Sequence, residues 1–280
     1  MTCGVLIFAH DSTIDYGSQA VVSAALAKQN LGVPVSLVAD AQTITAVKSR
    51  FKQLPFDQII EIERPTTDNR RQLNGETVDF INTDRSTALD VTPYDRTLVI
   101  DSDFLIFSDS LNQYWDDPRD FLIAPGMLDL VETRTDPTGY ELHPHSIPMS
   151  WATTMMFTRS EETRILFDLV EYIKEEYEYF ASLYQFPTAR YRNDFAFSVA
   201  CHILGGHGIN PWHGELPVPL LIKDTDNIVD IRPTGEIVFL SRDVVTDSYA
   251  LAHCCNQDVH VMNKQNILDN VDQLLELAND

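Results

Sequence analysis

The segment Tyr94-Asp95-Arg96-Thr97-Leu98-Val99-Ile100-Asp101-Ser102-Asp103 decides the fold that we predict for this chain. Residues 97–100 form a short apolar run that is typical of a buried strand. Two carboxylates follow it directly, so we expect them at the carboxyl edge of a sheet, where open α/β folds bind their ligands. A turn after Asp101 would let Asp101 and Asp103 converge on one divalent cation, because such ions prefer oxygen ligands. A solvated strand end would show the same short pattern, so the surrounding sequence has to decide.

Short apolar runs alternate with helical patterns on the N-terminal side of this segment. Strands are predicted at residues 5–9, 35–39 and 58–62, and helices at 16–30, which Gly32 would end, and 43–51. This β-α-β-α-β order is typical of a parallel sheet covered on both faces. We therefore predict an α/β fold with a mixed, mainly parallel sheet flanked by helices.

The C-terminal part adds further strands and two longer helical patterns. Ser160 is expected to cap a helix that Pro187 ends, and a second helix is expected at 192–204. The polar segment 129–148 is longer than an ordinary connection, which predicts a functional loop or a small insertion. Because no repeat or linker divides the chain, we predict one domain over 1–280, with halves at 1–107 and 108–280. The remaining strands are expected at residues 104–107, 121–124, 151–157, 218–222, 237–240 and 259–262, and a closing helix from about residue 265.

Composition limits the partners of the chain. With 20 Lys+Arg against 42 Asp+Glu, the formal net charge of the 280 residues is −22. Such a surface repels phosphate backbones and anionic lipid unless its few basic residues gather on one face. No apolar run is long enough for a membrane helix, and the first residues lack a basic region, so we expect no membrane association and a cytoplasmic location. The four cysteines have no C-x-x-C spacing, which argues against a zinc knuckle or a disulfide framework.

The order of strand, D-x-D and second hydrophobic strand resembles the metal-binding element of GT-A glycosyltransferases, especially the glycogenin-like retaining enzymes. The resemblance implies a GT-A fold and a nucleotide-diphosphate sugar donor, most simply a UDP-sugar, held by the half 1–107. The segment Asp258-Val259-His260-Val261-Met262-Asn263-Lys264 resembles the family's last metal-ligand segment, although its Gly is missing and Lys264 lies closer to the histidine. Asp101, Asp103 and His260 would then bind the metal, and Lys264 the diphosphate. An imidazole among oxygen ligands favours Mn²⁺ over Mg²⁺.

The same resemblance assigns the donor and catalytic residues. Residues 9–16 would form the nucleotide-base pocket, with Tyr16 stacking on the base, Asp40 binding its edge, and Ala9 and His10 beside it. Ser102 and Thr153 would contact the donor, although Ala152-Thr153-Thr154 replaces the family's Asn-Ser/Ala-Gly. Arg85 would contact the donor, and Asn193 would lie beside the sugar and acceptor. Asp194 would orient the acceptor hydroxyl or act as a base, unless it is an ordinary helix cap.

The acceptor stays open between two classes. The stretches 175–184 and 190–198, together with 259–263, resemble a group of tailed-phage GT-A proteins that includes enzymes glycosylating hydroxymethylated cytosines of phage DNA. This implies a flipped base as the acceptor and the host cytoplasm as the location. It requires a basic face, for which the available residues are Arg64, Arg70, Arg71, Arg190 and Arg192. Without that face, a glycan, protein or small-molecule acceptor is favoured.

Three other function classes fit the sequence less well. A nucleotide-sugar-binding protein without catalysis would share the fold but not the convergence of Asp101, Asp103 and His260. A phosphatase with a D-x-D-x-T/V motif is disfavoured because Leu105 holds the last position. A nucleotidyltransferase would need a glycine-rich basic loop after the first strand, and residues 9–13 are not one.

Overall fold

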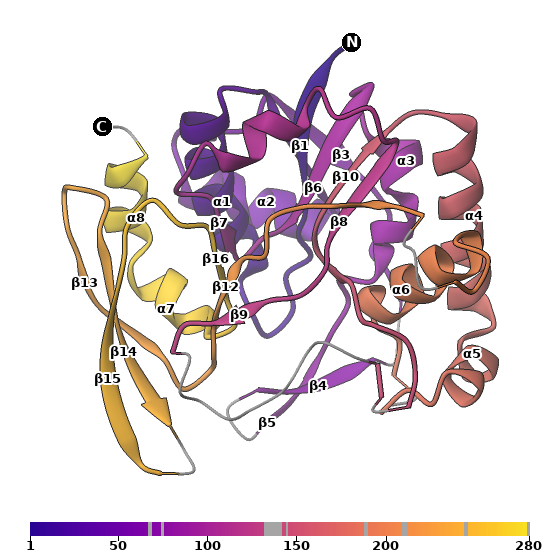
Figure 1. Ribbon diagram of the computed structural model, residues 1–280. Coiled ribbons are helices and arrows are strands. Elements are labelled where there is room, and N and C mark those ends of the chain that lie inside the picture. Colours follow the sequence, from indigo (N-terminus) through magenta and orange to yellow (C-terminus); the bar gives the residue numbers. More distant parts are fainter. Residues whose placement is uncertain are drawn as a thin grey trace.

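The computed structural model describes residues 1–66, 69–73, 76–131, 142–143, 145–187, 190–208, 212–243 and 246–278 (Figure 1). Its strands are β1 (Cys3–Phe8), β2 (Val35–Ala39), β3 (Gln58–Glu61), β4 (Arg70–Leu73), β5 (Glu76–Asp79), β6 (Arg96–Asp101), β7 (Phe104–Leu105), β8 (Phe121–Ala124), β9 (Leu128–Asp129), β10 (Trp151–Thr158), β11 (Gly214–Glu215), β12 (Leu220–Ile222), β13 (Asn227–Ile231), β14 (Ile237–Asp243), β15 (Ser248–Cys254) and β16 (Val259–Val261). Its helices are α1 (Tyr16–Leu31), α2 (Ala41–Arg50), α3 (Ala88–Val91), α4 (Glu161–Glu175), α5 (Tyr177–Leu183), α6 (Asn193–Leu204), α7 (Lys264–Asp269) and α8 (Val271–Leu277), with 3₁₀ turns η1 (Asp84–Thr87) and η2 (Ser110–Tyr114).

A seven-stranded sheet in the order β11-β8-β10-β6-β1-β2-β3 forms the centre of the molecule. Strands β6, β1, β2 and β3 are parallel neighbours, whereas β10 runs antiparallel to both β6 and β8. Helices α1 and α2 connect the parallel strands, and Gly32 ends α1 in the left-handed conformation with φ 66°. The predicted class, a mixed and mainly parallel sheet flanked by helices, is confirmed.

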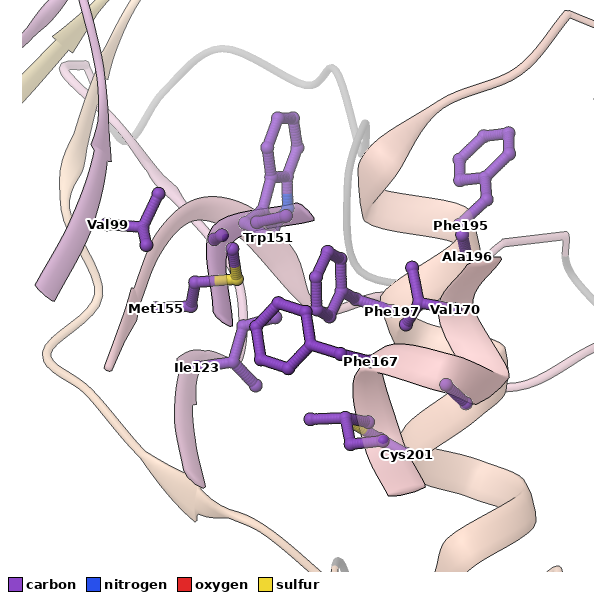
Figure 2. Close-up of a cluster of buried hydrophobic side chains, with 14 of the residues drawn as sticks. Val99, Ile123, Trp151, Met155, Phe167, Val170, Phe195, Ala196, Phe197 and Cys201 are labelled. Carbon is purple, nitrogen blue, oxygen red and sulfur yellow. The ribbon is translucent and has the colours of Figure 1, made fainter. Parts of the chain in front are cut away.

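Side chains of the central strands alternate between two cores, as the period of a strand requires. Leu6 and Val99 point to the core under α4 and α6, whereas Val5, Ile7 and Leu98 point to the core under α1 and α2. In Figure 2, the labelled side chains of Val99, Ile123 and Met155 lie on the sheet side of the first core and those of Phe167, Val170 and Phe197 on the helix side. This core joins residues from both halves of the chain.

A second, four-stranded sheet receives the chain directly after the D-x-D motif. Its order is β7-β16-β12-β9, and β7 begins at Phe104, immediately after Asp103. His260 of β16 pairs with Phe104 in the antiparallel register, and the Val261 N–H donates to the Asp103 carbonyl at 2.9 Å. The turn between β6 and β7 therefore brings His260 next to the two aspartates, although about 160 residues separate them in sequence.

Two small antiparallel sheets were not predicted, although the strand expected at 237–240 is part of β14. Strands β13, β14 and β15 form one sheet, which projects beyond α8 in Figure 1, and β4 pairs with β5 in the other. Most of β15 and much of β13 are exposed, including the apolar side chains of Tyr249 and Leu251, so the apolar residues of these strands do not mark a buried face.

The predicted helix over residues 160–186 is wrong in its continuity. Ser160 caps it with a capping box as expected, but α4 ends at Glu175 and α5 begins at Tyr177. The break lets Tyr177 and Phe180 reach the core under α4. The closing helix is likewise divided at Asn270 into α7 and α8.

Most of the predicted loop 129–148 lies outside the described residues. Among the helices that the structure describes, none combines the length and apolarity that crossing a bilayer needs.

Candidate functional site

One pocket lies where the carboxyl end of β6 meets the start of β16, β10 and α6. Ten of the residues singled out from the sequence line it: Tyr16, Arg85, Asp101, Ser102, Asp103, Thr153, Asn193, Asp194, His260 and Lys264. Phe8, Phe80, Asn82, Trp151, Arg192 and Met262 complete the lining.

A carboxylate–imidazole cluster lies in this pocket. Asp101 ends β6, Asp103 lies in the turn that follows, and His260 comes from β16. The Nε2 atom of His260 is 3.6 Å from Oδ2 of Asp101 and 3.3 Å from Oδ1 of Asp103. One ligand atom from each of the three residues lies within 4.8 Å of the others, so the cluster could hold a metal ion. Two carboxylates and one imidazole are a donor set that suits Mn²⁺.

Each carboxylate of the cluster also forms an ion pair with a buried cation. Lys264 Nζ pairs with Oδ2 of Asp103 and donates to the Val261 carbonyl at 3.2 Å. Arg85 Nη2 pairs with Oδ1 of Asp101, while its Nη1 donates to the Ala152 carbonyl at 2.7 Å. Burial lowers the pKa of Arg85 to about 10, which still leaves the guanidinium charged at neutral pH. Two buried cations of the pocket therefore lie directly beside the two carboxylates of this cluster.

Ala9, His10 and Asp40 lie together at the ends of β1 and β2, but they are not among the lining residues of the pocket. His10 Nδ1 is 3.0 Å from Asp40 Oδ2, which Arg64 Nη1 also approaches at 2.8 Å. Burial lowers the pKa of His10, against the effect of Asp40, so the imidazole is neutral at pH 7. Burial would raise the pKa of Asp40, but hydrogen bonds from Thr43 and His10 and the charge of Arg64 lower it below its usual value.

The tautomer of His10 follows from these contacts. A neutral imidazole whose Nδ1–H donates to Asp40 presents Nε2 as an acceptor. No hydrogen-bond partner for this buried Nε2 is found in the part of the chain that the structure describes. Asn82 links His10 to the pocket, because its Oδ1 accepts from the His10 N–H at 3.0 Å and its carbonyl accepts from Asn193 Nδ2 at 3.2 Å.

Asp194 lies at the opposite wall of the pocket, in the first turn of α6. Its Oδ1 accepts the Ala152 N–H at 2.9 Å, and its Oδ2 is 2.9 Å from Arg192 Nη2. The guanidinium of Arg192 in turn lies 5.9 Å from the ring centroid of Trp151. Asp194 is therefore not the cap of its own helix, because Arg192 holds the N-cap position and its side chain makes no capping hydrogen bond. It joins the start of β10 to α6 instead.

Sequence reasoning missed several lining residues. Asn82, Phe80 and Phe8 belong to no motif, and nothing in their spacing distinguishes them from core or loop residues. Trp151 stands near the predicted site residue Thr153, and this adjacency was its one available signal. Arg192 was expected only as part of a basic face, although it directly precedes Asn193.

The arginines required for a DNA-binding face are largely paired with acids of this chain. Arg64 contacts Asp40, Arg192 contacts Asp194, and Arg70 Nε lies 3.5 Å from Asp79 Oδ1. Arg190 Nη1 donates to the Arg70 carbonyl at 2.6 Å. The side chain of Arg71 lies outside the described residues.

Comparisons with known proteins identify glycosyltransferases as structural neighbours. The galactosyltransferase LgtC has a TM-score of 0.49 at 12% identity, over 99% of this chain and 95% of LgtC. The glycosyltransferase GlyE of Streptococcus pneumoniae has a TM-score of 0.44 at 10% identity, over 77% of this chain and 45% of GlyE, so this chain spans less than half of GlyE. Mouse xyloside xylosyltransferase 1 has a TM-score of 0.44 at 9% identity, over 78% of this chain and 86% of that protein. No family model and no curated protein sequence matches.

Proposed function

We propose that this protein is a metal-dependent glycosyltransferase that uses a nucleotide-diphosphate sugar. The observation that carries the proposal is the convergence of Asp101, Asp103 and His260 in a pocket that also holds Lys264 and Arg85. Acidic metal ligands beside fixed cations suit a diphosphate, whose oxygens can bind the metal and the cations at once.

The roles of the chain's own residues follow from this arrangement. Asp101, Asp103 and His260 would hold Mn²⁺, or Mg²⁺ in its place. Such an ion, when bound, neutralises the charge that develops on a diphosphate leaving group. Lys264 and Arg85 line the same pocket and would bind the phosphates, and Ser102, between the two aspartates, would offer the donor a further hydroxyl.

The nucleotide base would bind between Tyr16 and the His10–Asp40 pair. Tyr16 lines the pocket, whereas His10 and Asp40 are buried outside its lining and are linked to it through Asn82. A base that reaches His10 would meet an acceptor at Nε2, which suits an N–H group such as the N3–H of uracil, and on this ground we propose a UDP-sugar. Ala9 would then fix the backbone at this end of β1, where its N–H donates to the Val38 carbonyl at 3.0 Å.

The sugar and the acceptor hydroxyl would lie towards α6. Thr153, Asn193 and Asp194 line that wall of the pocket. A buried carboxylate can orient a hydroxyl group or accept its proton. We assign this role to Asp194, with Asn193 beside it as a hydrogen-bonding partner of the sugar.

A screen of nucleotide sugars by thermal shift, with and without Mn²⁺, tests the donor directly. A ligand that binds the native state at 100 times its Kd adds about 2.7 kcal/mol to the free energy of unfolding. We expect one UDP-sugar to raise the unfolding temperature in the presence of Mn²⁺ and much less in its absence. If no nucleotide sugar stabilises the protein under either condition, the proposal fails.

Two acceptor classes remain, and one observation favours the neutral class over DNA. A second cavity is lined in part by Ser150 and Ser198, and its described lining contains serine and histidine side chains and Glu215 but neither lysine nor arginine. The salt bridges of Arg64, Arg70 and Arg192 further reduce the unpaired positive charge that these three described residues could offer a phosphate backbone. We therefore propose a neutral hydroxylated acceptor, such as a glycan, over a hydroxymethylated base in phage DNA.

Transfer assays distinguish these acceptors once the donor is known. Radiolabelled donor is incubated with hydroxymethylcytosine-containing DNA, with unmodified DNA and with a panel of glycans. Label in a glycan alone supports the neutral acceptor, whereas label that appears only in the modified DNA overturns it and establishes the DNA acceptor.

A further inference from the structure

Lys264 and Arg85 form ion pairs with the same two carboxylates that a metal ion would need as ligands. Lys264 pairs with Asp103, and Arg85 pairs with Asp101, so each acid already has a positive partner. Both partners are nearly inaccessible to solvent, with the side chains of Lys264 and Arg85 only 5% and 9% exposed. Water therefore screens these charges less than it would at the surface.

The charges of this cluster balance in the protein as it stands. The two cations and the two carboxylates cancel, and a histidine that serves as a metal ligand is neutral. A divalent ion that enters alone adds two positive charges next to Lys264 and Arg85. A diphosphate that enters alone brings negative charge next to Asp101 and Asp103. When both enter together, the metal takes the carboxylates, the phosphates take the two cations, and the balance is kept.

We propose that Lys264, with Arg85, acts as an internal counter-cation that makes metal binding conditional on the diphosphate. This inference rests on the proposed function, because it concerns the same metal and donor. Lys264 is then more than a phosphate ligand. It holds Asp103 until the phosphates arrive, and it releases this carboxylate to the metal as it moves to them.

The position of Lys264 suits such an exchange. It is the first residue of α7, four residues after His260, and its ammonium group also donates to the Val261 carbonyl. This carbonyl belongs to the same strand as His260, so the lysine stem is anchored close to the site whichever anion its ammonium group contacts.

The test is a titration of Mn²⁺ into the full chain, with free Mn²⁺ measured by EPR and corrected for the Mn²⁺–UDP complex that forms without protein. For the wild-type protein, saturating UDP should tighten Mn²⁺ binding by more than about tenfold. By thermodynamic reciprocity, Mn²⁺ should tighten UDP binding by the same factor. Uridine, which lacks the diphosphate, should leave the Mn²⁺ affinity unchanged.

The decisive variant is Lys264→Gln, whose amide can still donate to the Val261 carbonyl. It leaves Asp103 without its cation, so it should bind Mn²⁺ alone at least about tenfold more tightly than the wild type does, and UDP should add less. A lysine that serves only as a phosphate ligand would leave the affinity for Mn²⁺ alone unchanged. Lys28→Gln is the charge-matched control, because Lys28 lies in the last turn of α1 and pairs with the exposed Asp57. It should bind Mn²⁺ as the wild type does.

The outcomes separate the inference from the function on which it rests. If wild-type protein binds Mn²⁺ equally well with and without UDP, or Lys264→Gln does not gain affinity for Mn²⁺ alone, the counter-cation role is wrong while the glycosyltransferase proposal stands. If the wild type binds neither Mn²⁺ nor UDP in any combination, both are wrong. If Lys264→Gln fails to fold, Arg85→Gln replaces it, because it removes the cation that pairs with Asp101. It should also bind Mn²⁺ alone more tightly than the wild type does, and an unchanged affinity would overturn the counter-cation role.

Discussion

The Oδ1 atom of Asp194 accepts a hydrogen bond from the Ala152 N–H at 2.9 Å, and this contact ties the start of β10 to the first turn of α6. The other oxygen of the carboxylate faces Arg192. Asp194 is thus held in one orientation at the wall of the pocket by two partners from different segments. A substitution can therefore remove the charge of Asp194 and keep the hydrogen bond that positions its side chain.

Replacing Asp194 by Asn keeps an acceptor for the Ala152 N–H but removes the negative charge. If Asp194 orients or deprotonates the acceptor hydroxyl, kcat should fall by about 100-fold or more, because general acid–base catalysis contributes about 10²- to 10⁴-fold. The free energy of unfolding should change little. Asp168→Asn on the exposed surface of α4 is the matched control and should leave both quantities unchanged. Wild-type kcat in Asp194→Asn would rule out the assigned role.

His10 should make stability depend on pH between about 7.5 and 5.5. Its pKa is lower in the folded protein than the 6.5 of an unperturbed histidine, because burial disfavours the charged form. Below about pH 6.5, His10 is therefore protonated in the unfolded chain but is still largely neutral in the folded protein. The free energy of unfolding consequently falls as the pH falls. His202 and His213 have pKa values lowered by burial and act in the same direction. Urea unfolding of His10→Gln at several pH values should give a shallower dependence than the wild type, and identical slopes would contradict this explanation.

Phe167 should be one of the residues that stability depends on most. Its ring is buried in the core of Figure 2, with centroids 4.9 Å from that of Phe157 and 5.6 Å from that of Phe197. Phe167→Ala should lower the free energy of unfolding by about 3–5 kcal/mol, as is usual for a buried phenylalanine. Ile165→Ala on the same helix is the control, because Ile165 is half exposed and should cost far less. Equal losses in the two variants would mean that this core is not formed as described.

Gly4 is required because the ring of Tyr94 packs directly on it. A Cβ atom at Gly4 would lie 2.4 Å from the nearest ring atom of Tyr94, whose hydroxyl is 2.6 Å from Ser36 Oγ. Gly4→Ala should cost about 1–3 kcal/mol of stability, the usual cost of overpacking a core. In a Tyr94→Ala background, the same substitution should cost clearly less, and a double-mutant cycle measures the difference. An additive cycle would show that the two residues do not meet.

The same contact explains part of the opening motif. Tyr94 packs on Gly4, Asp95 accepts the Thr2 N–H at 2.7 Å, and Arg96 is buried at the start of β6. These residues stand at the amino end of the strand, so they hold β6 against β1. Only the carboxyl end of the motif, at Asp101 and Asp103, enters the pocket.

Local patterns predicted the features that depend on short segments of sequence. Apolar runs located the central strands, Gly32 and Ser160 marked helix ends, and the D-x-D motif pointed to the edge of the sheet where the pocket lies. Exposed strands such as β15 carry no such signal. Neither does the pairing of Lys264 with Asp103 or of Arg85 with Asp101, because these contacts depend on how distant segments meet in the folded chain.

The most direct test of the central claim is the turnover of the donor by Asp103→Asn, beside the wild type and His260→Gln, with and without Mn²⁺. The variants are first checked for cooperative unfolding, since loss of the Asp103 charge leaves Lys264 buried without its partner carboxylate. We predict Mn²⁺-dependent release of UDP from a UDP-sugar by the wild type. In both variants this Mn²⁺-dependent release should fall by more than about 100-fold. Mutating a residue that only hydrogen-bonds to a metal ligand already lowers metal affinity or activity by about 10- to 100-fold. Folded Asp103→Asn with undiminished Mn²⁺-dependent activity would contradict the assignment of this pocket as a metal-dependent glycosyltransferase site.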